Sequence, residues 1–296
     1  MEKGDKTIEN HSDHEDELKP DLADPTVKKH QETIKLLTYN TCYGLKSNTL
    51  ISAYNSTYRV VHARKDPEEI SQKSDFSEVF DMIKEHSPNI VVLNEIFDDL
   101  QTKPVLEELE KMGFKYNFVG NSGHHTKPLI VSTVLASKLP CENTNIHFTF
   151  PEGLPGSGGG AVGVYFKEMD LFLLGFHIAC VQKHLVPQLK EIDDFYERIK
   201  SKYKNIILTG DFNREYEFYK KRSAALKEFN FVKEKRTFPS FFPIYKPFSF
   251  LSPNLVVGQV DNIFYKGDIK VLNSKVLDGK RSDHKPIIAE LILQKC

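Results

Sequence analysis

Short apolar runs recur along this chain, and polar segments separate them. Four of the runs span residues 34–39, 90–94, 171–176 and 206–210. Nearly continuous apolar runs of this length suit strands that are buried on both faces. The same kind of pattern predicts further strands at 128–136, 160–166, 260–265, 268–276 and 285–293.

Between these runs, apolar residues recur every three or four positions, which predicts amphipathic helices. The first of them has a Ser74 or Asp75 cap and ends before Pro88. Helices are expected at 76–83, 105–112, 186–199, 216–222 and 224–229. Because helices and strands alternate and no change of composition divides residues 34–296, the sequence predicts one α/β domain.

The first 33 residues differ from the rest in composition. They carry ten acidic residues against five lysines, a net charge of −5, and leave +4 for the remainder of the chain. With few large apolar side chains, such a segment cannot offset the entropy lost on ordering. We therefore expect a disordered acidic N-terminal tail at 1–33, followed by a catalytic domain at 34–296.

The sequence contains no apolar segment typical of a signal peptide at its N-terminus. No run approaches the roughly 18 apolar residues of a membrane span. Cys42, Cys141, Cys180 and Cys296 have no paired metal-binding spacing, so we expect free thiols. These features predict a soluble intracellular protein of the cytoplasm or nucleus, without stable membrane insertion. They indicate no obligate protein partner.

Polar groups that can bind a metal ion or move a proton follow the apolar runs. The first four runs lead to Asn40, Glu95, His177 and Asp211, and Asn213 lies two residues beyond Asp211. The run at 260–265 contains Asp261, and Asp283 and His284 precede the last run. Each residue alone also suits a turn or a solvated strand end. Because rigid strands can aim such groups at one rim of a sheet, their co-occurrence predicts an enzyme.

These residue types suit phosphate-ester hydrolysis, which needs a cation, a base for water and a donor for the developing charge. Carboxylate and amide oxygens of the kind found at Asn40, Glu95, Asp211, Asn213 and Asp283 suit Mg²⁺, with Mn²⁺ as a substitute. His177 and His284 titrate near neutrality, and Asp261 is suited to orient a histidine. Two histidines without a cysteine cluster or an HExxH helix make a poor zinc signature.

Six motifs occur in the order found in one superfamily. They are 37–40 (LTYN), 93–95 (LNE), 175–177 (GFH), 209–213 (TGDFN), 260–264 (VDNIF) and 282–286 (SDHKP). In these motifs residues 34–293 resemble the endonuclease/exonuclease/phosphatase superfamily, the deoxyribonuclease-I-like proteins. The resemblance implies a four-layer α/β (α+β) sandwich, in which two mixed β-sheets pack face to face with helices on both outer faces.

The resemblance also implies roles. Glu95 would be the principal magnesium ligand, assisted by Asn40 and Asp283. Asp211 and Asn213 would position or activate the attacking water. His284, supported by Asp261, would be the base or a phosphate contact, which leaves His284 and Asp211 as alternative bases. His177 would be the opposing acid or transition-state donor.

The chain also departs from individual branches of the superfamily. It has no tryptophan, which abasic-site endonucleases usually carry, and Asp261 is not in the Pro-x-Trp-Cys-Asp-Arg block of inositol-phosphate phosphatases. We therefore expect a metal-dependent phosphodiesterase, with a nuclease favoured and the subfamily open. The alternatives are a phosphomonoesterase, a lipid-headgroup phosphodiesterase acting on sphingomyelin or inositol phosphates, and a non-catalytic binding protein.

An aromatic segment at 237–251, TFPSFFPIYKPFSFL, bears on the substrate. Its rings suit either a packed, proline-stiffened loop or a platform on which nucleic-acid bases stack; a lipid-inserting wedge would use the same rings. The expected phosphate contacts nearby are Lys220, Lys221, Arg222, Lys233, Lys235 and Arg236. Nucleic acid is thus the expected partner.

Overall fold

The computed structural model describes residues 31–46, 72–97, 100–121, 131–146, 158–180, 182–238 and 258–294. The predicted N-terminal tail lies outside these residues, apart from 31–33. The aromatic segment also lies outside them from residue 239 on.

Two mixed six-stranded sheets make up the centre of the molecule. The first contains, in spatial order, β11 (Ile269–Val276), β12 (Ile287–Gln294), β1 (Gln31–Asn40), β2 (Ile90–Phe97), β4 (Val131–Ser137) and β3 (Tyr116–Asn121). The second contains β5 (Glu142–Asn143), β6 (Gly158–Phe166), β7 (Leu171–Ile178), β8 (Asn205–Asp211), β10 (Asp261–Lys266) and β9 (Asn230–Phe231). In each sheet one central pair is parallel, β1 with β2 and β7 with β8.

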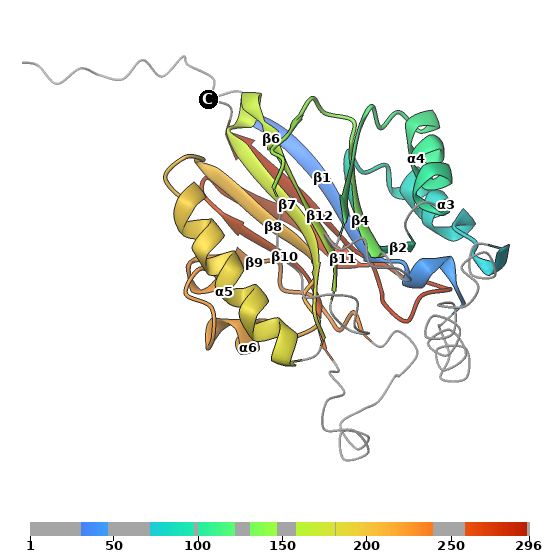
Figure 1. The fold of residues 1–296 in the computed structure, drawn as a ribbon. Coiled ribbons are helices and arrows are strands. Elements are labelled where there is room, and N and C mark those ends of the chain that lie inside the picture. Colours follow the sequence, from blue (N-terminus) through green and yellow to red (C-terminus); the bar gives the residue numbers. More distant parts are fainter. Residues whose placement is uncertain are drawn as a thin grey trace, which may run out of the picture.

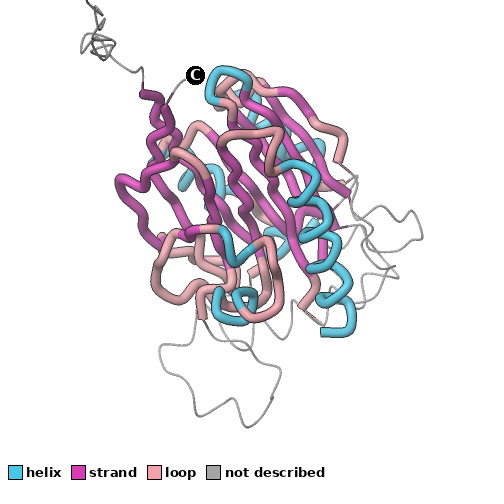
Figure 2. The backbone as a smooth tube through the Cα atoms, turned by 90° about the vertical axis from the view of Figure 1, so that its left-hand side faces the viewer, coloured by secondary structure: helices cyan, strands magenta, loops and turns pink. Residues whose placement is uncertain are grey.

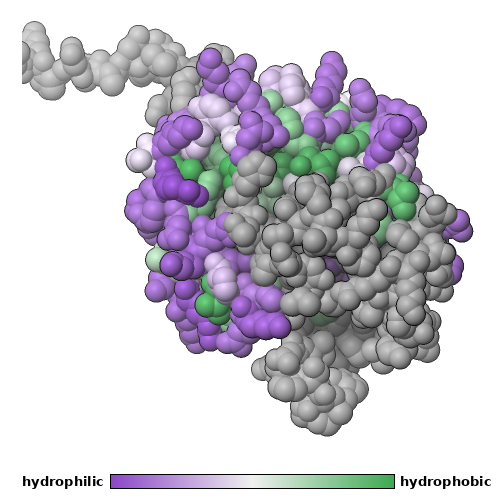
Figure 3. Space-filling view, viewed as in Figure 1, coloured by the Kyte–Doolittle hydropathy of each residue, from purple (hydrophilic) through white to green (hydrophobic). Residues whose placement is uncertain are grey.

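Helices cover the outer face of each sheet (Figure 1). α3 (Ser77–His86) and α4 (Thr102–Lys111) pack on the first sheet, and α5 (Gln182–Ile199) and α6 (Tyr216–Lys220) pack on the second. Seen from the side of the second sheet, α5 lies in front of the strands (Figure 2). The solvent-facing side of the half that contains the second sheet is largely hydrophilic (Figure 3), as expected for amphipathic helices. The described residues also contain short 3₁₀ helices: η1 (Cys42–Gly44), η2 (Lys167–Met169) and η3 (Leu226–Glu228).

Side chains alternate between two apolar cores along each central strand, because successive residues of a strand point to opposite faces. In β1, Ile34 and Leu36 lie in the core between the sheets, whereas Leu37 and Tyr39 pack beneath α3 and α4. This arrangement confirms the predicted four-layer sandwich and the prediction that these strands are buried on both faces.

Most of the predicted elements are present, with two corrections. β1 begins at Gln31, because residues 31–33 pair with residues 294–292 of β12, so these three residues belong to the domain and not to the tail. The helix expected at 224–229 is reduced to η3. There Asp193 of α5 accepts the N–H groups of Ala224 and Ala225, and the chain then enters β9.

The sequence pattern did not reveal β3, β5 or β9, two of which are only two residues long. Within the described residues, Cys42, Cys141 and Cys180 form no disulfide. Within the described ranges, no helix combines the length and apolar character that a membrane crossing requires.

Candidate active site

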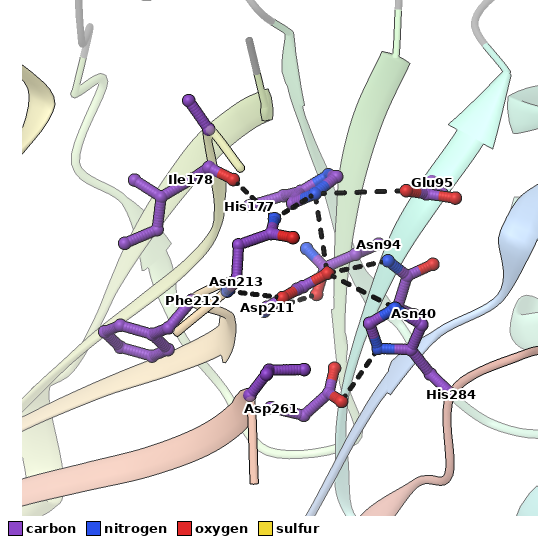
Figure 4. Close-up of polar contacts among 12 residues, drawn as sticks. Asn40, Asn94, Glu95, His177, Ile178, Asp211, Phe212, Asn213, Asp261 and His284 are labelled. Atoms are coloured by element: carbon purple, nitrogen blue, oxygen red, sulfur yellow. Dashed lines mark hydrogen bonds and ion pairs between the residues drawn. The ribbon is translucent and has the colours of Figure 1, made fainter. Parts of the chain in front are cut away.

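The predicted site residues meet at one end of the sandwich, on the sides of the two sheets that face each other. In the second sheet, His177, Asp211 and Asp261 are register partners on β7, β8 and β10. In the first sheet, Asn40 of β1 pairs with Asn94 of β2. Each of these positions except Asn94 was predicted, and period-two alternation aims all of them at the opposite sheet, as Figure 4 shows.

Asp211 is the centre of this network. Its Oδ2 accepts a hydrogen bond from Asn40 Nδ2 at 2.8 Å, and its Oδ1 accepts the Asn213 N–H at 2.7 Å. The same Oδ2 lies 3.5 Å from Nε2 of His177 and 3.8 Å from Nε2 of His284. One carboxylate oxygen is therefore held between two imidazole rings, at 1% side-chain exposure.

Glycine is required immediately before Asp211. Gly210 has a φ of +135°, and a Cβ there would lie 1.9 Å from the carbonyl oxygen of Phe176 on β7. A larger residue would force β7 and β8 apart at the point where they carry His177 and Asp211. The glycine of the TGDFN motif thus serves the close approach of these two strands.

His284 is hydrogen-bonded to Asp261. Its Nδ1 lies 2.9 Å from Asp261 Oδ2, and Thr237 Oγ1 accepts the Asp261 N–H at 3.1 Å. Burial opposes the imidazolium form, but the Asp261 and Asp211 carboxylates outweigh it and hold the pKa of His284 well above its ordinary value. The predicted support of His284 by Asp261 is therefore present, and Nε2 of His284 is left facing Asp211.

His177 has a different environment. Its Nε2 lies 3.1 Å from the amide nitrogen of Asn213, which also donates to the Ile178 carbonyl at 2.7 Å. Because an amide nitrogen only donates, the hydrogen-bond network makes this Nε2 an acceptor and the ring neutral. Burial lowers the pKa of His177, against the opposing effect of Asp211, which agrees with a neutral ring.

Glu95 lies on a distorted part of β2. The register of β2 with β4 shifts between Leu93 and Ile96, and Glu95 has a φ of +58°. Its Oε1 is 3.9 Å from Nε2 of His177. Burial and the Asp283 carboxylate raise the pKa of Glu95 to about 8. A buried carboxyl group next to a second carboxylate is suited to a cation that neutralises the charge, so the chemistry of Glu95 and Asp283 fits the predicted divalent metal.

A second set of possible ligands consists of Asp211, Asp261 and His284. One ligand atom from each lies within 4.8 Å of the others, close enough to share an ion. Asp261 and His284 are already hydrogen-bonded to each other, however, and both are almost fully buried. We favour the side of Glu95, because burial and the nearby Asp283 carboxylate both act against the negative charge of Glu95, which a bound cation would stabilise.

Asn40 makes hydrogen bonds through both ends of its side-chain amide. Its Nδ2 is bound to Asp211, and its Oδ1 accepts the Cys42 N–H at 3.0 Å. That N–H belongs to a left-handed turn in which Cys42, Tyr43 and Gly44 have φ values of 47°, 57° and 66°. Such strain persists only where the surroundings enforce it. Asn40 thus ties this turn to Asp211.

Sequence reasoning assigned no role to Asn94, Thr237 or Ser282. Asn94 Oδ1 accepts the Asp211 N–H at 3.1 Å, and its Nδ2 donates to Thr133 Oγ1 at 2.9 Å. Ser282 Oγ donates to the Asn40 carbonyl at 2.7 Å and accepts the His284 N–H at 3.0 Å. An amide within an otherwise apolar run was a usable signal for Asn94, whereas Thr237 was noted only as the start of the aromatic segment.

Comparison with known proteins agrees with this geometry. The model of the endonuclease/exonuclease/phosphatase family matches residues 37–284. The chain therefore belongs to this family of phosphoester hydrolases. Among curated protein sequences, no match was found.

Several solved structures share the fold. The endonuclease/exonuclease/phosphatase of Beutenbergia cavernae is 15% identical, with a TM-score of 0.57 over 88% of this chain and 72% of that one. A family protein of Bacteroides thetaiotaomicron is 17% identical, with a TM-score of 0.55 over 89% and 96%. TDP2 of D. rerio, complexed with a single-strand DNA product, is 13% identical, with a TM-score of 0.54 over 88% and 99%. At these identities the similarity establishes the fold.

Proposed function

We propose that this protein is a divalent-metal-dependent phosphodiesterase that cleaves nucleic acid by direct attack of water on phosphorus. The observation that carries the proposal is the position of Asp211, whose Oδ2 lies 3.5 Å from His177 and 3.8 Å from His284. Two proton-handling rings and a fixed carboxylate around one point are the groups that in-line hydrolysis of a phosphodiester needs.

In this proposal Glu95 and Asp283 hold the metal, Mg²⁺ or Mn²⁺. A bound divalent ion supplies charge neutralisation at the phosphate. Asn40 assists this site, since its side chain hydrogen-bonds Glu95 as well as Asp211 and the Cys42 N–H.

Asp211 is the group that orients the attacking water and accepts its proton. Asn40 and the Asn213 N–H hold its two oxygens from different sides, so the carboxylate cannot rotate freely. A base that is fixed before the substrate arrives loses no orientation entropy in the reaction.

His284 is the donor to the phosphate. Its bond to Asp261 favours the imidazolium form and directs Nε2–H away from Asp261. This arrangement makes Asp211 the better of the two candidate bases. His177 accepts the Asn213 amide at Nε2, and an acceptor nitrogen cannot bond a phosphate oxygen, so His177 is assigned to hold the attacking water through the O–H of that water.

Nucleic acid is the proposed substrate because two groups of basic residues follow Asp211 and Asn213 in the chain. Lys220, Lys221 and Arg222 are exposed at and just after the C-terminal end of α6, and Lys233, Lys235 and Arg236 lie on the segment that leads to Thr237. The chain beyond residue 33 has a net charge of +4. The DNA product bound to the similar D. rerio TDP2 is of the same substrate class.

The test is hydrolysis of a substrate panel in Mg²⁺: single- and double-stranded DNA, RNA, sphingomyelin vesicles, inositol phosphates and a phosphomonoester. We expect cleavage of nucleic acid, loss of activity in EDTA, and recovery with Mg²⁺ or Mn²⁺. D211N should be inactive. The matched control, D268N, removes an exposed carboxylate that pairs with Lys204 beyond the far end of β10, and it should behave as wild type.

Two results would overturn parts of the proposal. Hydrolysis that persists in excess EDTA would exclude the metal-dependent mechanism. Hydrolysis of vesicles with no binding of oligonucleotides at low salt would replace the nuclease with a lipid-headgroup phosphodiesterase.

A further inference from the structure

Arg214 lies next to the catalytic motif and bridges the ends of two strands. Its NH1 donates to the carbonyl oxygen of Asn213 at 2.7 Å, and its NH2 donates to that of Cys180, also at 2.7 Å. Cys180 follows β7, which carries His177, and Asn213 follows β8, which carries Asp211. Both terminal nitrogens of the guanidinium are therefore fixed beside the site.

The positive charge of Arg214 has no carboxylate partner in the described part of the chain, since every ion pair there involves other residues. The acid next to it, Glu215, is directed elsewhere: a Cβ at Gly258 would lie 1.8 Å from its Oε1. Arg214 is only half-buried, so its guanidinium can be reached from solvent. An anchored, unpaired guanidinium beside a phosphoesterase site is positioned for an anion.

A second arginine stands nearby. The guanidinium carbon of Arg214 lies 5.9 Å from the centroid of the Phe218 ring, and that of Arg222 lies 4.1 Å from the same centroid. The Phe218 ring thus contacts two cations, Arg214 and Arg222.

Arg214 retains donors for a ligand. A guanidinium carries more N–H groups than the two carbonyl bonds use, and its planar shape matches phosphate oxygens. Because the carbonyls already hold the side chain, binding an anion costs less rotamer entropy than it would for a free surface arginine.

We propose that Arg214 binds the phosphate next to the scissile one in a polynucleotide strand, and that Arg222 continues this phosphate track. The proposal rests on the proposed phosphodiesterase function. It adds that the site distinguishes a strand, which carries neighbouring phosphates, from a diester with a single phosphate.

Catalysis gives the first test. The full-length wild type, R214Q and R198Q are compared in Mg²⁺ on a single-stranded oligonucleotide and on bis(p-nitrophenyl) phosphate, which has one phosphate. R214Q should lower kcat/KM about tenfold on the oligonucleotide, the effect expected of one charged hydrogen bond, and leave the small diester within about twofold. R198Q is the matched control, because Arg198 is exposed at the last turn of α5, beyond which the chain enters β8 at the end opposite Asp211.

A purely structural role of the carbonyl bonds predicts a different result. If those bonds only hold the two strand ends in place, R214Q will lose activity equally on both substrates, and the proposal is overturned. An unchanged kcat/KM on the oligonucleotide would also overturn it.

Binding gives a test that does not need turnover. Oligonucleotide affinity is measured by fluorescence anisotropy in EDTA over a series of salt concentrations. R214Q should reduce the slope of log K against log salt by about one, R214K should retain it, and R198Q should match wild type.

The two proposals can fail separately. If the wild type hydrolyses neither substrate in Mg²⁺ while R214Q still reduces the salt slope, the proposed catalytic function fails and the phosphate subsite stands. If the wild type cleaves the oligonucleotide and R214Q has the wild-type slope and rate, only the subsite fails.

Discussion

Asn40 and Asp211 belong to different sheets and are joined by a 2.8 Å hydrogen bond from Asn40 Nδ2 to Asp211 Oδ2. The two residues are 171 positions apart in the chain and almost fully buried. This bond connects the β1 half of the site to the β8 half. If Asp211 lost this donor, its buried carboxylate would either rotate or remain buried with one hydrogen bond fewer. Because either change is unfavourable, we expect the bond to affect turnover.

Replacing Asn40 tests this connection. N40A should lower kcat by about 10- to 100-fold, the range expected when a hydrogen bond to a charged group is lost. N40D should lower it further, since it places a second carboxylate against Asp211. The control is N230A, an exposed position on β9. A wild-type kcat for N40A would mean that Asp211 needs no support from the first sheet.

Metal binding and turnover should separate in two variants. E95Q should weaken Mg²⁺ binding measured by calorimetry, and excess metal should only partly restore its activity. H284A should retain nearly wild-type metal affinity while losing turnover by roughly a hundredfold or more. Equal metal affinities and equal rates in the two variants would contradict these assignments. A loss of metal affinity in D261N but not in E95Q would indicate that the ion binds at the cluster of Asp211, Asp261 and His284.

The pKa of Glu95 predicts a pH dependence of stability without metal. It is raised from 4.5 to about 8 in the folded protein, so between these pH values the folded state holds a proton that the unfolded state has released. The free energy of unfolding in EDTA should therefore fall as pH rises through this window.

E95Q isolates this effect from the other titratable groups that face Glu95, namely His177, Asp211, Asp283 and His284. Urea denaturation at several pH values should show a smaller decline in E95Q than in wild type. Mg²⁺ binding needs the ionised carboxylate, so stabilisation by Mg²⁺ should increase towards pH 8 and above. Identical pH profiles for the two proteins in EDTA would rule out the raised pKa.

The start of β1 predicts different outcomes for two truncations. Removal of residues 1–30 should leave the melting temperature and kcat almost unchanged, because the acidic composition of this segment favours few core contacts. Removal of residues 1–33 should lower the melting temperature, since it also deletes the pairing of Gln31, Glu32 and Thr33 with β12. Equal melting temperatures for the two truncated proteins would show that this pairing contributes nothing.

The apolar pattern predicted the central strands and the four layers because both depend on local alternation. Runs that end at Asn40, His177 and Asp211 are buried on both faces, and period two places their last side chains on the inner face. The pattern did not predict β3, whose Asn117 and Gly120 interrupt it, nor the loss of the helix at 224–229, which depends on Asp193 of another element.

By itself, the sequence determined which residues end the buried strands and which chemical groups they carry, because both follow from the order of the residues. Only the tertiary structure decided that Asp211 is shared by Asn40, His177 and His284, and that Asn94 supports it. It also decided that burial and the nearby Asp283 carboxylate raise the pKa of Glu95. Hydrogen bonds and pKa values depend on distance and burial, which are properties of groups brought together from remote parts of the chain.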